Sequence, residues 1–440
     1  MSAAKLTKQK LFHVAEIIHL RIFGHEMGEE MRKFLGNLGI SFFGGAISSV
    51  LLFVVSILVG RFLGPVEYGK YALYMALFSF LAIFFSFGLE TAIVRVAAQA
   101  DKERKKEILS TFVIFFLVNS LFWSLLFLLC SNFITKIFGV PAIFIFFAIL
   151  FAAINVLGAA LENYLKLLNQ FVFINIIRIV QGSFLLLSIL LLYFFSRGLF
   201  SLEQFIILNI VVVAFALITF LLRVRAFIDF VFDRGILREL FLFSSVIFLG
   251  VISGYLIQNG TNILINKFIG SRELGLYSAY YTLSVLVTGQ FIAFFAAVYF
   301  PAVAQAGDRV VIAKKIERIF PLFGGVWFLL TALVMFVGLK MYGEEYPIDY
   351  FIIFLFSLYS LFNLYGSLFG FITISGGDQI VVRNLFLSWF CIVILYFAFL
   401  WILGIIGMLT LYTVLLSYVT IFFANAVLNK YFCNKYLSTL

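Results

Sequence analysis

Charged residues are scarce in this chain of 440 residues, at 12% of the total. Soluble domains carry about 25% charged residues, whereas 64% of this sequence is hydrophobic. No soluble core could bury so much apolar surface. The composition therefore excludes a soluble globular protein and predicts an integral membrane protein.

Histidine and cysteine are also few, with three of each. The histidines all lie in the first 25 residues at a spacing of six, so on a helix they do not share a face. The cysteines have no metal-binding, redox or disulfide spacing, and no phosphate-binding Walker loop is present. We expect no enzymatic activity, no cofactor and no metal.

Long apolar runs make up most of the chain. We read twelve of them as membrane-spanning helices, because each is close to the ~20 residues that cross the hydrocarbon as a helix. The runs are continuous rather than alternating, which disfavours strands. The predicted spans are 37–60, 67–89, 108–130, 142–165, 172–196, 203–223, 240–265, 274–299, 319–340, 349–373, 380–402 and 406–428.

Basic residues are unevenly distributed between the ends of these spans. With the N terminus placed in the cytoplasm, about three quarters of the 31 Lys and Arg residues fall on the cytoplasmic side. The net charge of +10 therefore indicates basic cytoplasmic loops and cytoplasmic termini, and we expect no nucleic-acid partner. Residues 1–35 differ, because apolar residues at helical spacing alternate there with charges, which predicts an amphipathic helix on the cytoplasmic surface.

Two stretches of the sequence match at a constant offset. Residues 61–71 recur as 267–277, 206 positions later, and 98–100 recur as 304–306. In a membrane protein, two packed halves of this kind are typical of a transporter whose site lies between them. Six spans per half is an even number, so the halves enter the membrane in the same direction as parallel repeats.

The duplication sets the expected architecture. The predicted fold is an all-α integral membrane protein of twelve transmembrane helices, arranged as two six-helix parallel repeats around a central cavity. The expected parts are an amphipathic N-terminal segment 1–35, a six-helix lobe 36–223, a cytoplasmic linker 224–239, a second six-helix lobe 240–430 and a cytoplasmic tail 431–440.

Basic residues within or beside the spans are the first candidate binding groups. Arg178 lies about two turns into the fifth span, Arg383 begins the eleventh, and Arg61 and Lys267 are equivalents at offset 206. A charge inside a membrane is expensive unless it faces water or a partner. These four residues predict a path for an anionic substrate; the alternative for Arg178 and Arg383 is snorkelling to the inner headgroups.

The seventh span is unusually rich in amides. Gln258, Asn259 and Asn262 are the candidates for contacts with sugar hydroxyls, and hydrogen bonding to neighbouring helices is the alternative. Carboxylates are rare in the spans, and Glu90 is the candidate for ion coupling. Its alternative is a helix-end anchor paired with Arg95.

The stretch Gly64-Pro65-Val66-Glu67-Tyr68-Gly69-Lys70-Tyr71-Ala72-Leu73, followed by Phe87-Gly88-Leu89-Glu90-Thr91-Ala92, resembles the polysaccharide biosynthesis (O-antigen) flippase family. That family belongs to the multidrug/oligosaccharidyl-lipid/polysaccharide exporter superfamily, and Gly270 to Tyr277 is similar to it as well. Members often carry an acidic–basic pair where this chain has Thr261-Asn262, so any ion coupling through that pair is missing or relocated here.

The resemblance implies a flippase of the cell (plasma or inner) membrane that works by alternating access. Its substrate would be a polyprenyl-pyrophosphate-linked oligosaccharide, moved from the inner to the outer leaflet. The implied partners are this lipid-linked sugar, membrane lipids and other polysaccharide-assembly proteins. Two alternatives remain open, namely a cation-coupled multidrug exporter of the same fold and a membrane glycosyltransferase, polymerase or ligase acting on lipid-linked sugars.

Overall fold

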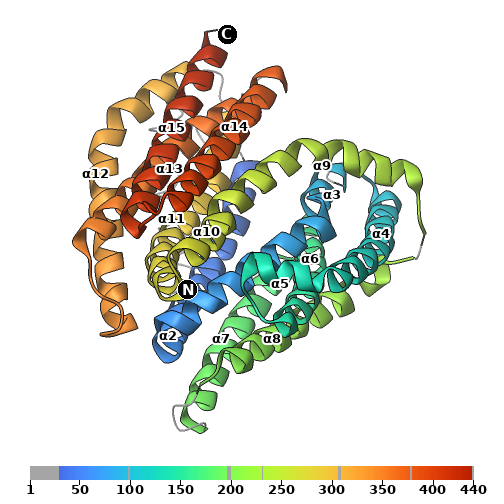
Figure 1. The fold of residues 1–440 in the computed structure, drawn as a ribbon. Coiled ribbons are helices and arrows are strands. Elements are labelled where there is room, and N and C mark those ends of the chain that lie inside the picture. Colours follow the sequence, from blue (N-terminus) through green and yellow to red (C-terminus); the bar gives the residue numbers. More distant parts are fainter. Residues whose placement is uncertain are drawn as a thin grey trace, which may run out of the picture.

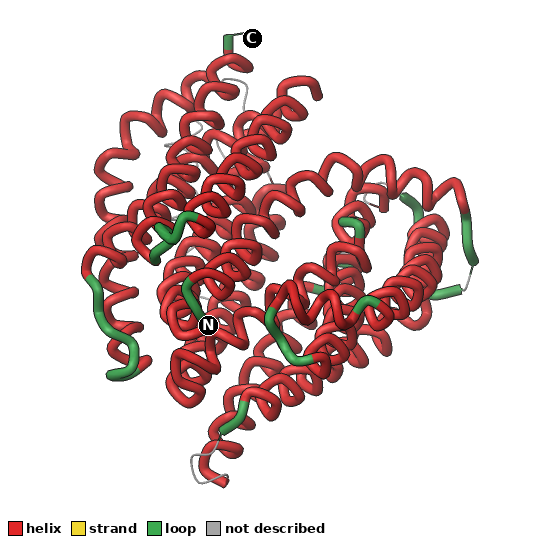
Figure 2. Tube along the Cα trace, in the orientation of Figure 1, coloured by secondary structure: helices red, strands yellow, loops and turns green. Residues whose placement is uncertain are grey.

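The computed structural model describes residues 29–97, 100–195, 200–229, 231–305, 309–376 and 379–438. Across these residues the chain is helical, and Figure 2 shows helices joined by short connections without a strand in the described part. Residues 1–28, which hold the three histidines and most of the predicted amphipathic segment 1–35, lie outside the described residues.

The helices follow one another with short connections, as the run of apolar segments predicts. In chain order they are α2 (Glu29–Ser86), α3 (Leu89–Ala97), α4 (Lys102–Leu129), α5 (Ser131–Phe138), α6 (Ala142–Leu167), α7 (Phe171–Phe195), α8 (Leu202–Val224), the 3-10 turn η1 (Arg225–Phe227), α9 (Arg234–Tyr255), the π-helical turn η2 (Leu256–Gly260), α10 (Thr261–Phe268), α11 (Ser271–Gln305), α12 (Arg309–Tyr342), α13 (Tyr350–Gly376), α14 (Gln379–Ile405) and α15 (Leu411–Leu437).

Within the described residues, nine helices are long and apolar enough to cross a membrane, or ten if the bent pair 234–245 and 250–268 forms one span. One of them, Gly44–Ser86, is 43 residues long and covers two of the predicted spans. The protein is thus a multi-pass, all-helical membrane protein, and the count of twelve spans stays a prediction.

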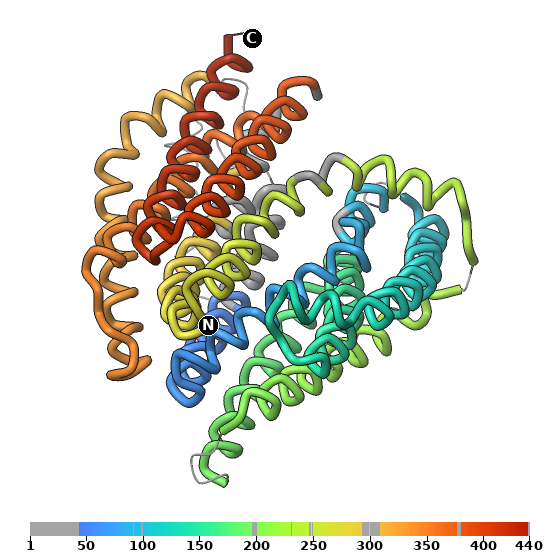
Figure 3. Tube along the Cα trace, in the orientation of Figure 1, coloured from blue at the N-terminus to red at the C-terminus, as the bar shows by residue number. Residues whose placement is uncertain are grey.

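The helices form two groups that meet along α2 and α11 (Figures 1 and 3). In the first group α2 packs against α6 and α7, and in the second α13 packs against α11, α12 and α15. Helix α9 contacts α3 and α4 of the first group and α14 of the second. We call the side at which α15 ends the C-terminus side, and the opposite side, where α10 ends and α11 begins, the far side. The ribbons of the two groups diverge towards the C-terminus side (Figure 1).

Glycine sets the two breaks in the first half. Gly64 has φ 72° and interrupts α2 directly before Pro65, a conformation that suits glycine because it carries no Cβ. Phe87 and Gly88 both have positive φ and separate α2 from α3. The equivalents of these two residues at offset 206 are Ala293 and Phe294, and α11 runs through them unbroken.

A glycine allows a close helix approach in the first half but not at the equivalent place in the second half. A Cβ on Gly44 would lie 2.5 Å from the Asn175 side chain, so α2 and α7 touch through this glycine. A Cβ on Gly250 would make an ordinary contact with the Phe386 ring at 3.5 Å, and one on Gly254 would meet nothing within 4 Å. Close packing through glycine therefore occurs at Gly44 and not at Gly254.

Candidate functional site

The duplicated motif forms the contact between the two helix groups on the far side. A Cβ on Gly69 would lie 1.9 Å from the Ser271 carbonyl oxygen, and one on Gly275 would lie 1.7 Å from that of Pro65. Pro65 and Ser271 are equivalents at offset 206, as are Gly69 and Gly275. Each half therefore presses its backbone onto the glycine of the other, and no larger residue fits at either position.

Tyrosine hydroxyls extend this contact. Tyr342, at the end of α12, shares hydrogen bonds with Ser56 at 3.0 Å and with Tyr68 at 3.3 Å, both on α2. Tyr346 donates to the Gly60 carbonyl oxygen at 2.8 Å. Burial raises the pKa of Tyr346 well above its ordinary value, so its hydroxyl stays protonated and keeps donating. We call this set, together with the glycine contacts, the far-side seal.

A charged cluster lies at the C-terminus side of the first helix group. Glu162 on α6 accepts two hydrogen bonds from Arg178 on α7, at 3.1 and 2.5 Å, and one oxygen lies 2.7 Å from Lys166 Nζ. Lys166 also donates to Asn163, whose amide bonds the Glu90 carbonyl oxygen. The cluster of Lys166, Arg178 and Glu162 has two cations for one carboxylate. The Glu162 side chain is 14% exposed and that of Arg178 41%, so the arginine retains access to a ligand.

The structure separates the four predicted cations. Arg178 is held by Glu162, and Arg383 is exposed on α14. Arg61 is exposed at the far-side seal beside Gly343. Lys267 lies on the same side, with Nζ 4.2 Å from the centroid of the Trp401 ring. Arg178 and Arg383 therefore lie towards the C-terminus side, and Arg61 and Lys267 lie towards the far side. This separation is compatible with a substrate that contacts the two pairs in succession, and not with one binding site formed by all four residues.

The amides of the seventh span do not form one polar wall. Gln258 is exposed, Asn259 is buried with 8% exposure, and Asn262 is intermediate. Their polar neighbours bond other helices or turns: Thr261 donates to the Ile257 carbonyl and pairs with Tyr396 on α14, and Asn266 accepts from Ser271. Helix-to-helix bonding thus explains part of the polarity, and Gln258 remains the accessible amide.

Glu90 lies near the start of α3 and does not pair with Arg95. Its Oε2 is buried without a hydrogen-bond partner, and the Arg95 guanidinium instead lies over the Phe243 ring at 4.1 Å. The proposed helix-end anchor is therefore wrong, because the aromatic face of α9 takes the arginine. A buried carboxylate with a free oxygen suits a proton or cation.

Glu162, the partner of Arg178, was not among the residues predicted from the sequence. Glu162 and Arg178 are each eight residues from Gln170, which lies in the turn between α6 and α7. Two antiparallel helices joined by a short turn bring residues at equal distances from that turn opposite each other. The equal spacing could therefore have predicted the contact between Glu162 and Arg178. In the described part of the chain, no group of three His, Cys, Asp or Glu residues could hold a metal ion.

Comparison of the whole structure with solved structures gives matches among membrane transporters. An inward-facing multidrug resistance MATE family transporter of the MOP superfamily aligns with a TM-score of 0.61 at 14% identity, over 89% of this chain and 95% of that one. A MOP superfamily transporter from Pyrococcus furiosus aligns at 0.60 and 12%, over 92% and 95%. The outward-facing form of the MATE family transporter aligns at 0.57 and 14%, over 92% and 96%. At these identities the likeness shows a shared fold.

Comparison of the sequence with curated proteins gives no match. A family model described as polysaccharide biosynthesis protein matches residues 58–340. This range contains both copies of the glycine motif and the Glu162–Arg178 pair. A match over more than half of the chain shows the family, so this transporter-fold membrane protein belongs to the polysaccharide biosynthesis protein family.

Proposed function

We propose that the protein is a flippase that moves a polyprenyl-pyrophosphate-linked oligosaccharide from the inner to the outer leaflet by alternating access. The observation that carries this proposal is the far-side seal. The two halves meet there through reciprocal glycine contacts and a few hydroxyl bonds. Two equivalent motifs thus close one side of the molecule, whereas the helix groups diverge on the other side, which is the arrangement expected of a rocking transporter closed on one side.

The distribution of basic residues orients this seal. The C-terminus side carries the greater share of Lys and Arg, so we place it in the cytoplasm. The far side then faces outward and is closed in this structure. The state corresponds to a carrier that receives its substrate from the cytoplasmic leaflet.

The charged cluster provides the chemistry for the substrate head. A pyrophosphate cannot cross hydrocarbon unassisted, because burial of an unpaired charge is very costly. Arg178 would meet it first, with Lys166 beside it and Glu162 fixing the guanidinium plane. Arg61 and Lys267 would follow on the outer side, and charge-assisted bonds of this type are the strong ones.

The test is reconstitution into liposomes with a fluorescent polyprenyl-pyrophosphate oligosaccharide, whose accessibility to an external quencher is followed over time. Faster transbilayer movement than in empty liposomes supports the proposal. A double variant, Arg178→Gln with Arg383→Gln, is expected to abolish the acceleration. Unchanged movement in that variant would rule out the cationic path.

A cation-coupled multidrug exporter is the second candidate, and the free buried oxygen of Glu90 favours it. This candidate predicts efflux of a cationic dye driven by a proton or sodium gradient. The same liposomes test it: dye efflux that is lost in Glu90→Gln, without movement of the lipid-linked sugar, would replace the flippase proposal.

A further inference from the structure

An apolar groove lies between the two helix groups. Its volume is about 460 Å³, within the ~300–1,000 Å³ of ordinary ligand pockets. One wall comes from α2, α4 and α5 and the other from α9, η2, α10 and α14. None of the residues lining the groove is charged, so the groove suits a hydrocarbon chain.

Aromatic rings form the floor of this groove and join the two groups. The ring centroid of Phe80 on α2 lies 5.8 Å from that of Phe138, 6.0 Å from that of Phe127 and 5.9 Å from that of Tyr255 on α9. Because Phe80 and Tyr255 belong to opposite walls, a relative motion of the two halves must change the shape of the groove. An occupant would therefore respond to the transport state.

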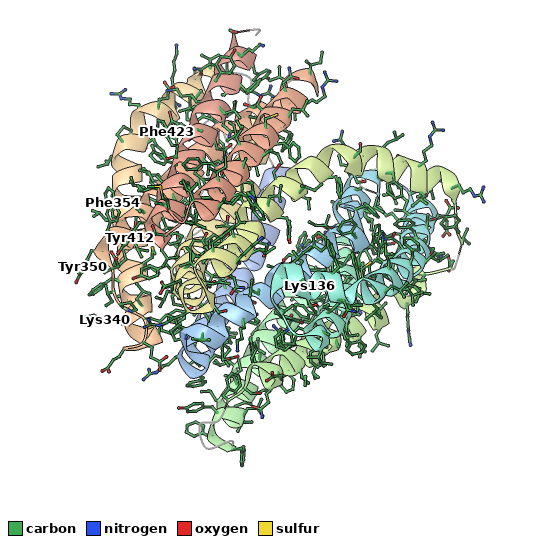
Figure 4. All side chains as sticks on the ribbon, in the orientation of Figure 1. Lys136, Lys340, Tyr350, Phe354, Tyr412 and Phe423 are labelled. Atoms are coloured by element: carbon green, nitrogen blue, oxygen red, sulfur yellow. The ribbon has the colours of Figure 1, made fainter. Side chains whose placement is uncertain are left out.

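A cation lies beside the groove. Trp401, which lines it, carries Lys267 Nζ over its ring at 4.2 Å. Lys136 is exposed on α5 (Figure 4), but by helical spacing it lies on the flank of α5 away from the lining residues Ile134 and Phe138. Neither lysine forms an ion pair with a carboxylate of the described residues. An apolar groove with an unpaired cation, Lys267, against its lining fits an anionic amphiphile.

The geometry points to this groove as the site for the hydrocarbon chain of the lipid-linked substrate, with its phosphate at Lys267. This inference rests on the proposed function. In a polyprenyl phosphate the charge is attached directly to a single chain, so chain and phosphate reach the groove and its rim together. A bilayer phospholipid has two chains, and its glycerol separates them from the phosphate, so it fits a single groove with one adjacent cation less well.

The test is photo-crosslinking of the full-length protein in phosphatidylcholine nanodiscs. One probe is polyprenyl phosphate with a diazirine on its chain, and the other is phosphatidylglycerol with the same group. We expect polyprenyl phosphate to label α5 and α14 well above the lipid-facing surface of α7. Lys267→Gln should reduce this labelling about fivefold, the effect of one basic residue on an anionic lipid.

Two variants separate the groove from general lipid contact. Ile137→Trp narrows the groove and should reduce labelling, whereas Phe194→Trp, on an exposed position of α7, should leave it unchanged. Equal labelling of α7, or equal labelling of the groove by phosphatidylglycerol, would overturn the inference. Loss of groove labelling while the liposomes still move the sugar rejects the groove alone. Groove labelling without sugar movement rejects the proposed function and retains the groove as a polyprenyl phosphate site.

Discussion

Replacing Gly69 by alanine is expected to force the far-side seal open. The added Cβ would lie 1.9 Å from the Ser271 carbonyl oxygen and 2.9 Å from its carbonyl carbon. Close C···O contacts begin at about 3.3 Å, so the two backbones must separate by about 1.4 Å. Overpacking of this kind costs about 1–3 kcal/mol, which corresponds to a roughly 5–150-fold loss of the sealed population.

The assay is a distance measurement between spin labels on the far side of each half, at Glu203 on α8 and Tyr350 on α13, with Cys130 and Cys391 replaced by serine. We expect Gly69→Ala to broaden the distribution towards longer distances and to lower the Tm. Gly158→Ala on α6 is the matched control, because a Cβ there meets nothing within 4 Å and alanine favours a helix interior by about 0.5–1 kcal/mol. If the two variants give the same distances and the same Tm, the argument from the glycine contact is refuted.

Three further variants test other parts of the molecule. Tyr342→Phe removes the hydroxyl that bonds α2, so it should cost about 1 kcal/mol and reduce the sealed population about fivefold in the same distance assay; an unchanged distribution would show that these bonds do not hold the seal. Glu162→Gln removes the charged partner of Arg178 and should lower the free energy of unfolding by about 1–2 kcal/mol, a figure reduced because the arginine is partly exposed to solvent. Thermal unfolding of the purified protein measures this effect, and an unchanged Tm would show that the pair does not stabilise the fold. Glu90→Gln should leave the rate of flipping without an imposed gradient unchanged and should abolish any stimulation of flipping by a proton gradient. Stimulation that persists in this variant would exclude Glu90 as the coupling group.

Periodicity and composition predicted the helices well because a membrane leaves the backbone few options. Five of the twelve predicted spans agree with observed helices to within three residues at both ends, as in 142–165 against Ala142–Leu167. The exceptions arise where local backbone choices decide. The first two predicted spans form the single helix α2, which is interrupted only at Gly64. The break at Phe87 depends on a positive φ, which a hydropathy pattern does not reveal.

The candidate site was less predictable, because its geometry depends on contacts between distant segments. The offset of 206 residues identified Gly69 and Gly275 as equivalents, but not that each one receives the backbone of the other half. Arg178 was recognised as an intramembrane charge, whereas its pairing with Glu162 needed the turn between α6 and α7. Lys267 and Trp401 are 134 positions apart in the sequence, and neither the sequence around Lys267 nor that around Trp401 indicates that they are in contact.

The π-helical turn Leu256–Gly260 has a consequence for how α10 can move. The spacing from Gly44 to Arg61 equals that from Gly250 to Lys267, yet the first stretch is regular α-helix and the second contains the wider turn. The difference is therefore one of winding and not of an inserted residue. Rewinding these five residues as α-helix would turn α10 about its own axis without lengthening the chain. The seventh span thus contains a point about which it can twist, and rewinding this turn would rotate Lys267, at the far-side end of α10, relative to α9.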